Sequence, residues 1–407
     1  FGIKRVLDPA APGSSVAVYF VLEHGQERYL GSPEEDRIGV RALDDRTVEF
    51  RLVAPAPYFL SVMNRPDGGP QPRHAIDGHE GDWTQPGSQV VSGAFRVDAR
   101  GSDRLSLRRR DDYTGPRGGN VERVEIVAAP VATSVEAFAR DEVDLVSVRY
   151  TPRLADVAPA AVPDARLGPA AWSGYLAFDH QQGPTSDLDL RLALAHAVDR
   201  DAISAILPIN MVVATGGIVP PALQGHTPDI SLRFDPDLAR EAFERSGFDG
   251  ALTVACLDED EMLVAPVLES WRTILGLGVQ VRPWRRSDIA TMPPPRQLAP
   301  IYLTGWLPGY ADPEYFLRLL FQSDSRTNEG GFASEAFDQL IERARQERSD
   351  RSRLELFHQA DRMAVVERVA VIPVVYGRSM SQVKPRVHGW WEFGKSSANF
   401  ADLLLDP

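Results

Sequence analysis

Cysteine is almost absent from this sequence, and its scarcity limits the chemistry that the chain can carry. Cys256 is the one cysteine among 407 residues, which excludes an intrachain disulfide and a metal site built from several cysteines. It lies inside the apolar segment ALTVACL, residues 251–257, so we expect a buried structural thiol rather than a nucleophile. Cysteine usage therefore does not identify the compartment in which the protein works.

Long apolar runs and an excess of positive charge are also missing. The chain has no run of about 18 apolar residues, the length of a membrane-spanning helix. Its formal net charge of −13 argues against a nucleic-acid-binding surface, which requires clustered positive charge. Hydrophobic residues make up 43% and charged residues 25% of the 407 residues, which is typical of a globular protein too long for a single core. We therefore expect two or three domains.

The motifs of the common enzyme classes do not occur. The sequence has no Walker loop, Rossmann glycine fingerprint, HExxH motif or G-x-S-x-G elbow. The densest group of possible metal ligands is His74, Asp77, His79, Glu80 and Asp82. A glycine-containing loop without helical ligand spacing is more typical of a solvated surface. We expect no metal site there.

Two further groups of ionisable residues have structural explanations. The acidic run from Asp258 to Glu261 stands at the expected start of a helix, where negative charge is favourable. His196 lies between two alanines of a predicted helix, and we expect a structural role for it. The sequence therefore predicts no enzyme and no cofactor.

The first part of the chain, up to residue 150, is dominated by short strands. Residues 38–53 alternate apolar and polar side chains, which predicts a β-hairpin. Residues 92–110 predict two strands joined by a Gly-Ser-Asp turn, and the segment VERVEIVAAP predicts another. A short helix running into a strand is expected at 134–148. Residues 151–170 contain four prolines, which favours a crossing between two lobes.

Beyond residue 171, longer helices alternate with short apolar runs. Residues 186–207 predict one helix capped by Ser186 or Asp187. The segment FDPDLAREAFERSGF predicts another, with Asp235 as its cap and Gly247 as its end.

A strand-helix-strand unit is expected next. It consists of ALTVACL, the helix around VLESWRTILG and the segment VQVRPW, which predicts two parallel strands. Two helices are expected between about 334 and 366, followed by the buried strand VAVIPVVYG.

The stretch GWLPGYADPEYFL, residues 305–317, places two large aromatic rings at a sharp turn. The apolar segment LAPIYLTG before it predicts a buried strand, and Asp312 followed by Pro313 predicts the start of a helix. Trp306 and Tyr310 thus lie between a strand and a helix, where ligands bind in open α/β sheets. The alternative is that both rings only cover the core, since Trp and Tyr are often buried for packing alone.

From SDLDLRLALAHAVDRDAI, residues 186–203, the chain resembles the family 5 extracellular solute-binding proteins of peptide-type ABC importers. Segments with the same resemblance follow in order along most of the chain, namely FGIKRVLDP, IGVRALDDRTVEFRLVAPAPYFL, VVSGAFRV, LSLRRRDDY, FARDEVDLV, GYLAFDH, FDPDLAREAFERSGF, LTGWLPGYADPEYFL and VIPVVYGRSM. No single segment is diagnostic, but the collinear set is specific.

The resemblance implies an α/β, two-lobed periplasmic-binding-protein-like fold of type II, the Venus-flytrap arrangement, with a small extra α+β subdomain. Residues 1–86 would form part of the extra subdomain, 87–168 and 378–407 part of lobe I, and 169–377 lobe II. Because the chain starts at Phe1, we expect it to be truncated or processed, without the family's N-terminal strands. A signal peptide or lipid-anchor cysteine would have stood in that missing segment.

The resemblance also implies where a ligand would bind. The loop from Trp306 to Asp312 would project into the cleft between the lobes. Four aromatic side chains and one arginine are expected to line it: Trp172, Trp306, Tyr310, Tyr376 and Arg378.

One position departs from the peptide-binding members of the family. In those members, an aspartate in the loop after the tryptophan holds the free α-amino group of the peptide. The matching position, three residues after Trp306, is Gly309, which has no carboxylate. Asp312 is the nearest acid, but its place before Pro313 predicts that its carboxylate caps the following helix. Nickel complexes, sugars, opines or blocked peptides are therefore as consistent with the sequence as free peptides.

The resemblance implies a non-enzymatic binding protein, active as a monomer, that closes two lobes over a small organic solute or peptide. It would present that solute to the membrane subunits of an ABC importer, in the periplasm or outside the cell. The same fold could instead be a ligand-sensing module of a larger regulatory protein, which would be cytoplasmic. Closure in either case requires that the ligand contact both lobes.

Overall fold

A computed structural model describes residues 1–407 except 11–15, 32–36, 80, 116–117, 149–161, 163, 209, 289–292, 294, 394–395, 398 and 407. The chain divides into two compact units. Unit 1 contains Phe1–Val146, Gln382–Glu392 and Ser396–Pro407, and unit 2 is mainly Ser147–Ser381. The predicted crossing at 151–170 lies largely outside the described residues, as does Glu80. The three-part division expected from the sequence stays a prediction.

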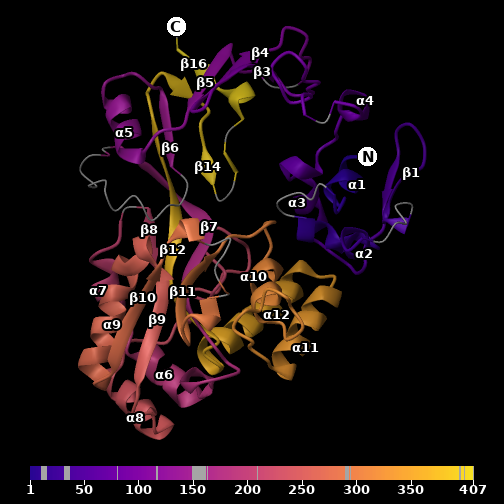
Figure 1. The fold of residues 1–407 in the computed structure, drawn as a ribbon. Helices are drawn as coiled ribbons and strands as arrows, with labels where there is room; N and C mark the ends of the chain where they lie inside the picture. The colour runs from indigo at the N-terminus through magenta and orange to yellow at the C-terminus, as the bar shows by residue number, and fades with distance from the viewer. Residues whose placement is uncertain are drawn as a thin grey trace. The chain divides into compact units, whose positions relative to one another are not determined.

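Unit 1 is built from short elements (Figure 1). The predicted hairpin is confirmed as β1 and β2, which pair antiparallel. The next two predicted strands and the one after them are confirmed as the antiparallel sheet β3-β4-β5. The helices are α1 (Gly2–Val6), α2 (Gly25–Tyr29), α3 (Phe59–Met63), α4 (Arg73–Ile76) and α5 (Val131–Ala139). The strands are β1 (Val40–Ala42), β2 (Val48–Phe50), β3 (Phe95–Arg100), β4 (Arg104–Arg109) and β5 (Arg123–Val127), and β6 (Leu145–Val148) begins in unit 1 and ends in unit 2.

Most of the C-terminal segment belongs to unit 1. The strands β13 (Val387–His388) and β16 (Leu404–Leu405) pair antiparallel, and β14 (Glu392–Phe393) pairs with β15 (Ser396–Ser397). Val387 and Leu403 form a small core with Val121. Arg386 adds an ion pair to Asp144, with 2.7 Å between Nε and Oδ1. The C-terminal segment is therefore joined to unit 1 by both apolar and charged contacts.

Unit 2 is organised around one sheet. Its strands are β7 (Arg166–Phe178), β8 (Met211–Val213), β9 (Ala251–Leu257), β10 (Gly278–Trp284), β11 (Ile301–Trp306) and β12 (Val371–Val383). The order inside the unit is β10-β9-β11-β7-β12, and β8 pairs with β12. Strands β9 and β10 run parallel, as the predicted strand-helix-strand unit requires. Strand β7 is antiparallel to both of its neighbours, β11 and β12.

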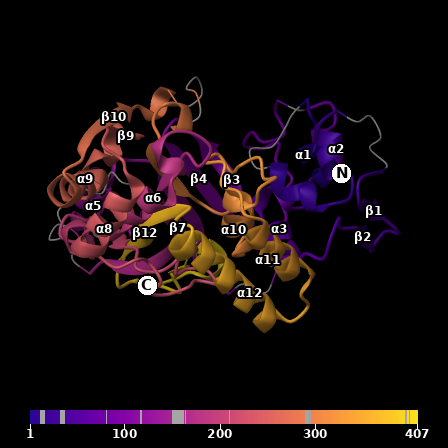
Figure 2. The same cartoon turned by 90° about the horizontal axis from the view of Figure 1, so that it is seen from below.

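Helices cover both faces of this sheet. One group is α6 (Leu188–His196), α7 (Arg200–Ser204), α8 (Pro236–Ser246) and α9 (Glu261–Leu275), and the other is α10 (Glu314–Phe321), α11 (Glu335–Gln346) and α12 (Asp350–Arg362). In both ribbon views the sheet strands lie between α6, α8 and α9 on one side and α10–α12 on the other (Figures 1 and 2). Unit 2 is thus a three-layer α/β unit, as expected from the alternation of helices and apolar runs.

The single helix predicted over residues 186–207 was wrong in one respect. The structure has two helices there, α6 and α7. The break arises because the Asp199 side chain accepts hydrogen bonds from the backbone N–H groups of Asp201 and Ala202, at 3.0 and 3.1 Å, and so starts a new helix. The predicted caps Asp187 and Asp235 are confirmed, and Gly247 ends α8 in the left-handed conformation.

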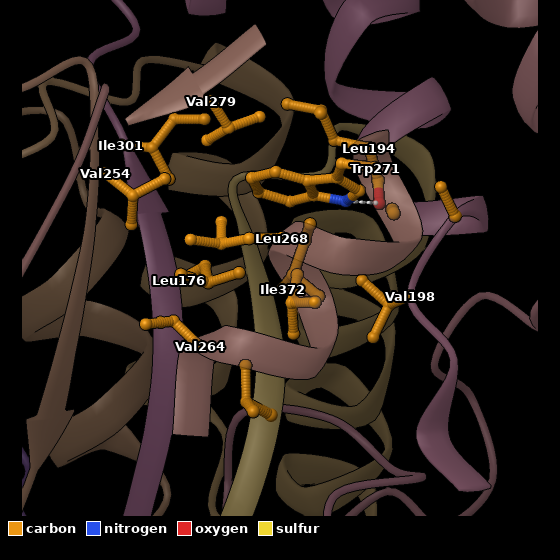
Figure 3. Close-up of a cluster of buried hydrophobic side chains, with 14 of the residues drawn as sticks. Leu176, Leu194, Val198, Val254, Val264, Leu268, Trp271, Val279, Ile301 and Ile372 are labelled. Carbon is orange, nitrogen blue, oxygen red and sulfur yellow. Dashed lines mark hydrogen bonds between the residues drawn. The ribbon is translucent and has the colours of Figure 1, made fainter. Parts of the chain in front are cut away.

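Two apolar cores stabilise unit 2, one on each face of the sheet. The core under α6, α8 and α9 surrounds Trp271, which is fully buried (Figure 3). The Trp271 Nε1–H donates to the carbonyl of Leu194 at 2.9 Å, so this large side chain is buried without losing its hydrogen bond. The second core, under α10–α12, contains Phe316, Phe337 and Phe357. These cores hold the strand ends on which the candidate site depends.

Cys256 is buried in the first core, as predicted. Burial raises the pKa of its thiol to about 12, with the nearby carboxylates of Glu261, Asp260 and Asp258 adding to the effect. The thiol is therefore protonated and inert at neutral pH. Among the described residues, no cluster of three or more histidine, cysteine or acidic side chains is arranged to hold a metal. No helix in the described part of the chain is long and apolar enough to cross a membrane.

Candidate functional site

Sheet register places two of the expected ligand-binding residues in one row. Trp306 of β11 and Tyr376 of β12 both pair with Ser173 of β7. The hydroxyl of Ser173, which is fully buried, donates to the carbonyl of Ile218 at 2.7 Å. The row is therefore rigid, because its central residue is fixed to a neighbouring segment.

Tyr376 is tied into this row by its hydroxyl. The O–H donates to the Gly217 carbonyl at 2.6 Å, and the ring meets that of His226 edge-on, with centroids 5.5 Å apart. Burial raises the pKa of the Tyr376 hydroxyl above its ordinary value, and the neighbouring Asp361 carboxylate adds to this. Tyr376 is thus a buried packing residue with an occupied hydroxyl.

Trp172 packs on the other face of the sheet, against the core of Trp271. Its ring lies over Gly174 and Gly305, which are register partners in β7 and β11. A Cβ atom at Gly174 would come within 2.4 Å of the ring, and one at Gly305 within 2.3 Å. Both positions therefore require glycine. Glycines inside two predicted strands signalled such a close approach, but the sequence analysis did not use them.

The loop between β11 and α10 holds its aromatic rings together. The predicted order of strand, loop and helix is confirmed, and β11 extends through Trp306. The Trp306 Nε1–H donates to the carbonyl of Tyr315 at 2.9 Å, and the two ring centroids are 5.7 Å apart. Tyr310 is buried and meets Tyr315 edge-on at 4.9 Å. Tyr315, which sequence reasoning missed, joins the two predicted rings into one cluster.

Asp312 ends this loop in a buried ion pair. Its carboxylate accepts two hydrogen bonds from the guanidinium of Arg353, at 2.7 and 2.9 Å, and one from the backbone N–H of Glu314 at 2.9 Å. The Arg353 guanidinium also lies over the Phe357 ring, 4.7 Å from its centroid. The prediction that the Asp312 carboxylate is occupied is confirmed, and Arg353 is a partner that the sequence did not reveal.

Gly309 and Arg378 complete the set of expected site residues. Gly309 is partly exposed in the loop that Asp312 ends. Arg378 is half-buried in β12, and its backbone N–H donates to the Asn210 carbonyl at 2.7 Å. Its guanidinium makes no hydrogen bond or ion pair with any residue that the structure describes.

A buried carboxylate lies close to the Tyr376 contact. Asp361 of α12 is fully buried, and its Oδ1 accepts from the backbone N–H of Ile218 at 2.9 Å. Burial raises the pKa of this carboxyl to about 7, against the hydrogen bonds that favour the charged form. A Cβ atom at Gly217 would lie 1.8 Å from its Oδ2, so glycine is required there.

A model of the bacterial extracellular solute-binding proteins, family 5 (middle part), matches residues 1–328. The chain belongs to this family. Members of the family bind solutes, and the match covers all of the expected site residues except Tyr376 and Arg378. The alternative of a ligand-sensing module within a larger regulatory protein has no comparable support.

The similar proteins include binding proteins with different ligands in their names. The periplasmic oligopeptide-binding protein OppA of Salmonella typhimurium is 27% identical over 413 residues, covering 95% of this chain and 74% of the relative. The probable deoxycholate-binding periplasmic protein YgiS of Escherichia coli is 26% identical over 413 residues, covering 96% and 75%.

Solved structures show the same fold. The substrate-binding domain of an oligopeptide ABC transporter from Bacillus anthracis superposes with a TM-score of 0.75 at 20% identity, covering 100% of this chain and 83% of that one. This likeness shows the two-lobed periplasmic-binding-protein fold expected for the family 5 chain.

Proposed function

We propose that this family 5 protein binds a small organic solute between its lobes and delivers it to an ABC importer, without catalysing a reaction. The family match over residues 1–328 is the observation that carries the proposal. The proposal includes the periplasm or cell exterior as the place of action, in keeping with the periplasmic relatives. We propose that the solute contacts Trp306, Gly309 and Arg378, backed by the buried Tyr310 and Tyr376. Trp172, on the other face of the sheet, would shape the strands beside this site.

The aromatic cluster supports a ligand wall at the end of β11. Trp306 is partly exposed although its Nε1–H is already bonded, so its ring can offer apolar area to a solute without a further polar requirement. Tyr310 and Tyr376 are buried and support that wall from behind. Arg378 would supply the charged contact, since its guanidinium is unpaired among the described residues.

The ligand class follows from what is missing at Gly309. A buried ammonium without a counter-charge costs on the order of several kcal/mol. Gly309 has no carboxylate, and the nearest acid, Asp312, is bound by Arg353 and by the N–H of Glu314. We therefore propose that the protein does not hold the free α-amino group of a peptide at this loop. Two relatives of almost equal identity, one named for oligopeptide binding and one for probable deoxycholate binding, are consistent with either ligand class.

Titration calorimetry with free and N-acetylated di- to pentapeptides tests this proposal. We expect the wild type to bind free peptides weakly or not at all. Gly309→Asp should bind them at least about tenfold more tightly, because a carboxylate then meets the ammonium. Gly309→Asn is the matched control, since its side chain has the same shape without the charge, and it should show no gain. Micromolar binding of free peptides by the wild type that is lost on N-acetylation would contradict the proposal.

A further inference from the structure

Unit 2 contains a cavity of about 110 Å³ on the α10 side of its sheet. It lies between β7, β11, the end of α10 and residues 327–332, elements that Figure 1 shows in unit 2. Aromatic side chains make much of its wall: Tyr175, Phe178, Tyr302, Trp306, Phe321 and Phe332. A cavity of this kind is a default binding-site candidate when a few polar groups converge on it.

Several polar side chains on the wall already have hydrogen-bond partners. The His180 Nε2 is 2.9 Å from the carbonyl of Ala370. The Thr327 hydroxyl donates to the Leu319 carbonyl at 2.6 Å, and the Asn328 amide bonds the backbone of Phe332 at both of its ends. None of these three groups needs a ligand.

Four polar side chains of the lining make no hydrogen bond or ion pair with described residues: Tyr175, Tyr302, Thr304 and Glu329. The Tyr175 and Tyr302 side chains are buried, with 4% and 3% of their surface exposed. Neither hydroxyl makes a hydrogen bond with any residue in the described part of the chain. Glu329, which also lines the cavity, is exposed and makes no hydrogen bond or ion pair within 4.0 Å with described residues. Both residues line the cavity, so their hydroxyls are open to hydrogen bonds with a molecule there.

Among the described residues that line the cavity, Glu329 is the one acidic side chain, and no lysine or arginine lines it. The Glu329 carboxylate lies close enough to raise the pKa of both tyrosines, although burial is the larger cause. Partial burial of its carboxylate raises the pKa of Glu329 as well, although the side chain is largely exposed, and the nearby Arg296 guanidinium lowers it. Burial lowers the pKa of His180 to about 4, so this histidine is neutral and adds no competing positive charge. The described lining therefore offers an anion no lysine or arginine, and it offers a metal ion a single carboxylate.

We propose that this cavity binds a small organic cation through an ammonium group. The ammonium would donate hydrogen bonds to the Tyr175 and Tyr302 hydroxyls and pair with the Glu329 carboxylate. The aromatic faces of the wall would stabilise the same charge, because the ring quadrupole attracts cations. The occupant is either a separate small amine or the ammonium end of the transported solute, and only the second source rests on the proposed function.

Calorimetry on the full chain with n-butylammonium, and with n-butanol as the uncharged analogue of the same shape, tests this inference. We expect saturable binding of one n-butylammonium per chain, at least about tenfold tighter than n-butanol. Glu329→Gln, which keeps the shape and removes the charge, should weaken it about tenfold or more. Tyr302→Phe should weaken it as well, and circular dichroism should show that both variants are folded.

Glu244→Gln is the matched control, because Glu244 is an exposed glutamate of α8 in the same unit. It should leave binding unchanged. Absence of saturable n-butylammonium binding, equal affinity for the amine and the alcohol, or unchanged affinity in Glu329→Gln would each overturn the inference. A competition experiment with the solute released from the protein distinguishes a separate amine from the ammonium end of the solute. Only a solute whose ammonium end occupies the cavity would exclude n-butylammonium. Absence of that competition alongside n-butylammonium binding would leave the cavity site standing, as the site of a separate amine.

Discussion

Replacing Arg353 with leucine is expected to lower the free energy of unfolding of unit 2 by about 3–5 kcal/mol. The guanidinium is 5% exposed and pairs with Asp312 at 2.7 Å, and it lies 3.7 Å from the carboxylate of Glu314, whose side chain is 1% exposed. The substitution leaves Asp312 buried without its counter-charge. Arg318 and Arg345 still contact Glu314, so the loss falls mainly on Asp312 and on the loop that it ends.

Chemical denaturation followed by circular dichroism measures this loss. Arg351→Leu is the matched control on the same helix, because Arg351 is 90% exposed and its pair with Glu355 lies in solvent. It should change stability by no more than about 1 kcal/mol. The double variant Arg353→Leu/Asp312→Leu should recover much of the loss, since an apolar pair can replace a buried ion pair. Equal effects of Arg353→Leu and Arg351→Leu would contradict this account of the loop.

Stability is expected to fall as the pH rises from about 4 to about 7 because of Asp361. Its folded pKa of about 7 exceeds the ordinary value of 3.8. Between these values the folded state binds a proton that the unfolded state does not, so raising the pH favours unfolding. The difference corresponds to a contribution of order 4 kcal/mol between pH 4 and pH 8, at about 1.4 kcal/mol for each pKa unit.

Asp361→Asn should remove this contribution. The amide keeps an oxygen that can accept from the Ile218 N–H, and it has no charge to bury. Asp260, Glu314 and Glu329 also have raised pKa values, so the quantity to measure is the difference between variant and wild type across the pH range. The variant should be the more stable protein above pH 7. Asp249→Asn, at an exposed aspartate, is the control. Its free energy of unfolding should change with pH in parallel with that of the wild type. If the free energy of unfolding of Asp361→Asn also followed that of the wild type in parallel across the pH range, the Asp361 carboxylate would be ionised in the folded protein.

Local signals in the sequence predicted much of the architecture. The aspartate caps of α6 and α8 were predictable because a cap needs only the residues of one turn. The parallel pair β9 and β10 followed from one strand-helix-strand segment. The break at Asp199 was missed because the apolar face of residues 186–207 continues past it, and periodicity alone does not show where a side chain turns back onto the backbone.

The candidate site was less predictable because its contacts join distant parts of the chain. Arg353 meets Asp312 across 41 positions, and Asp361 meets Ile218 across 143. No local pattern predicts such pairs. Trp306 could be singled out by its turn, but whether its ring packs on Tyr315 depends on where α10 returns to the sheet. The unpartnered hydroxyls of Tyr175 and Tyr302 become visible only once β7 and β11 are paired.

Native mass spectrometry of the ligand-free chain, equilibrated with the small-molecule extract of a bacterial culture, tests the central claim most directly. The account predicts a complex of one chain with one small organic molecule, and its chemical identity gives the solute. Trp306→Ala should lose most of this complex, because truncating a central aromatic contact costs about 2 kcal/mol or more of binding. A folded wild-type chain that retains no molecule from such extracts would contradict the assignment as a solute-binding protein.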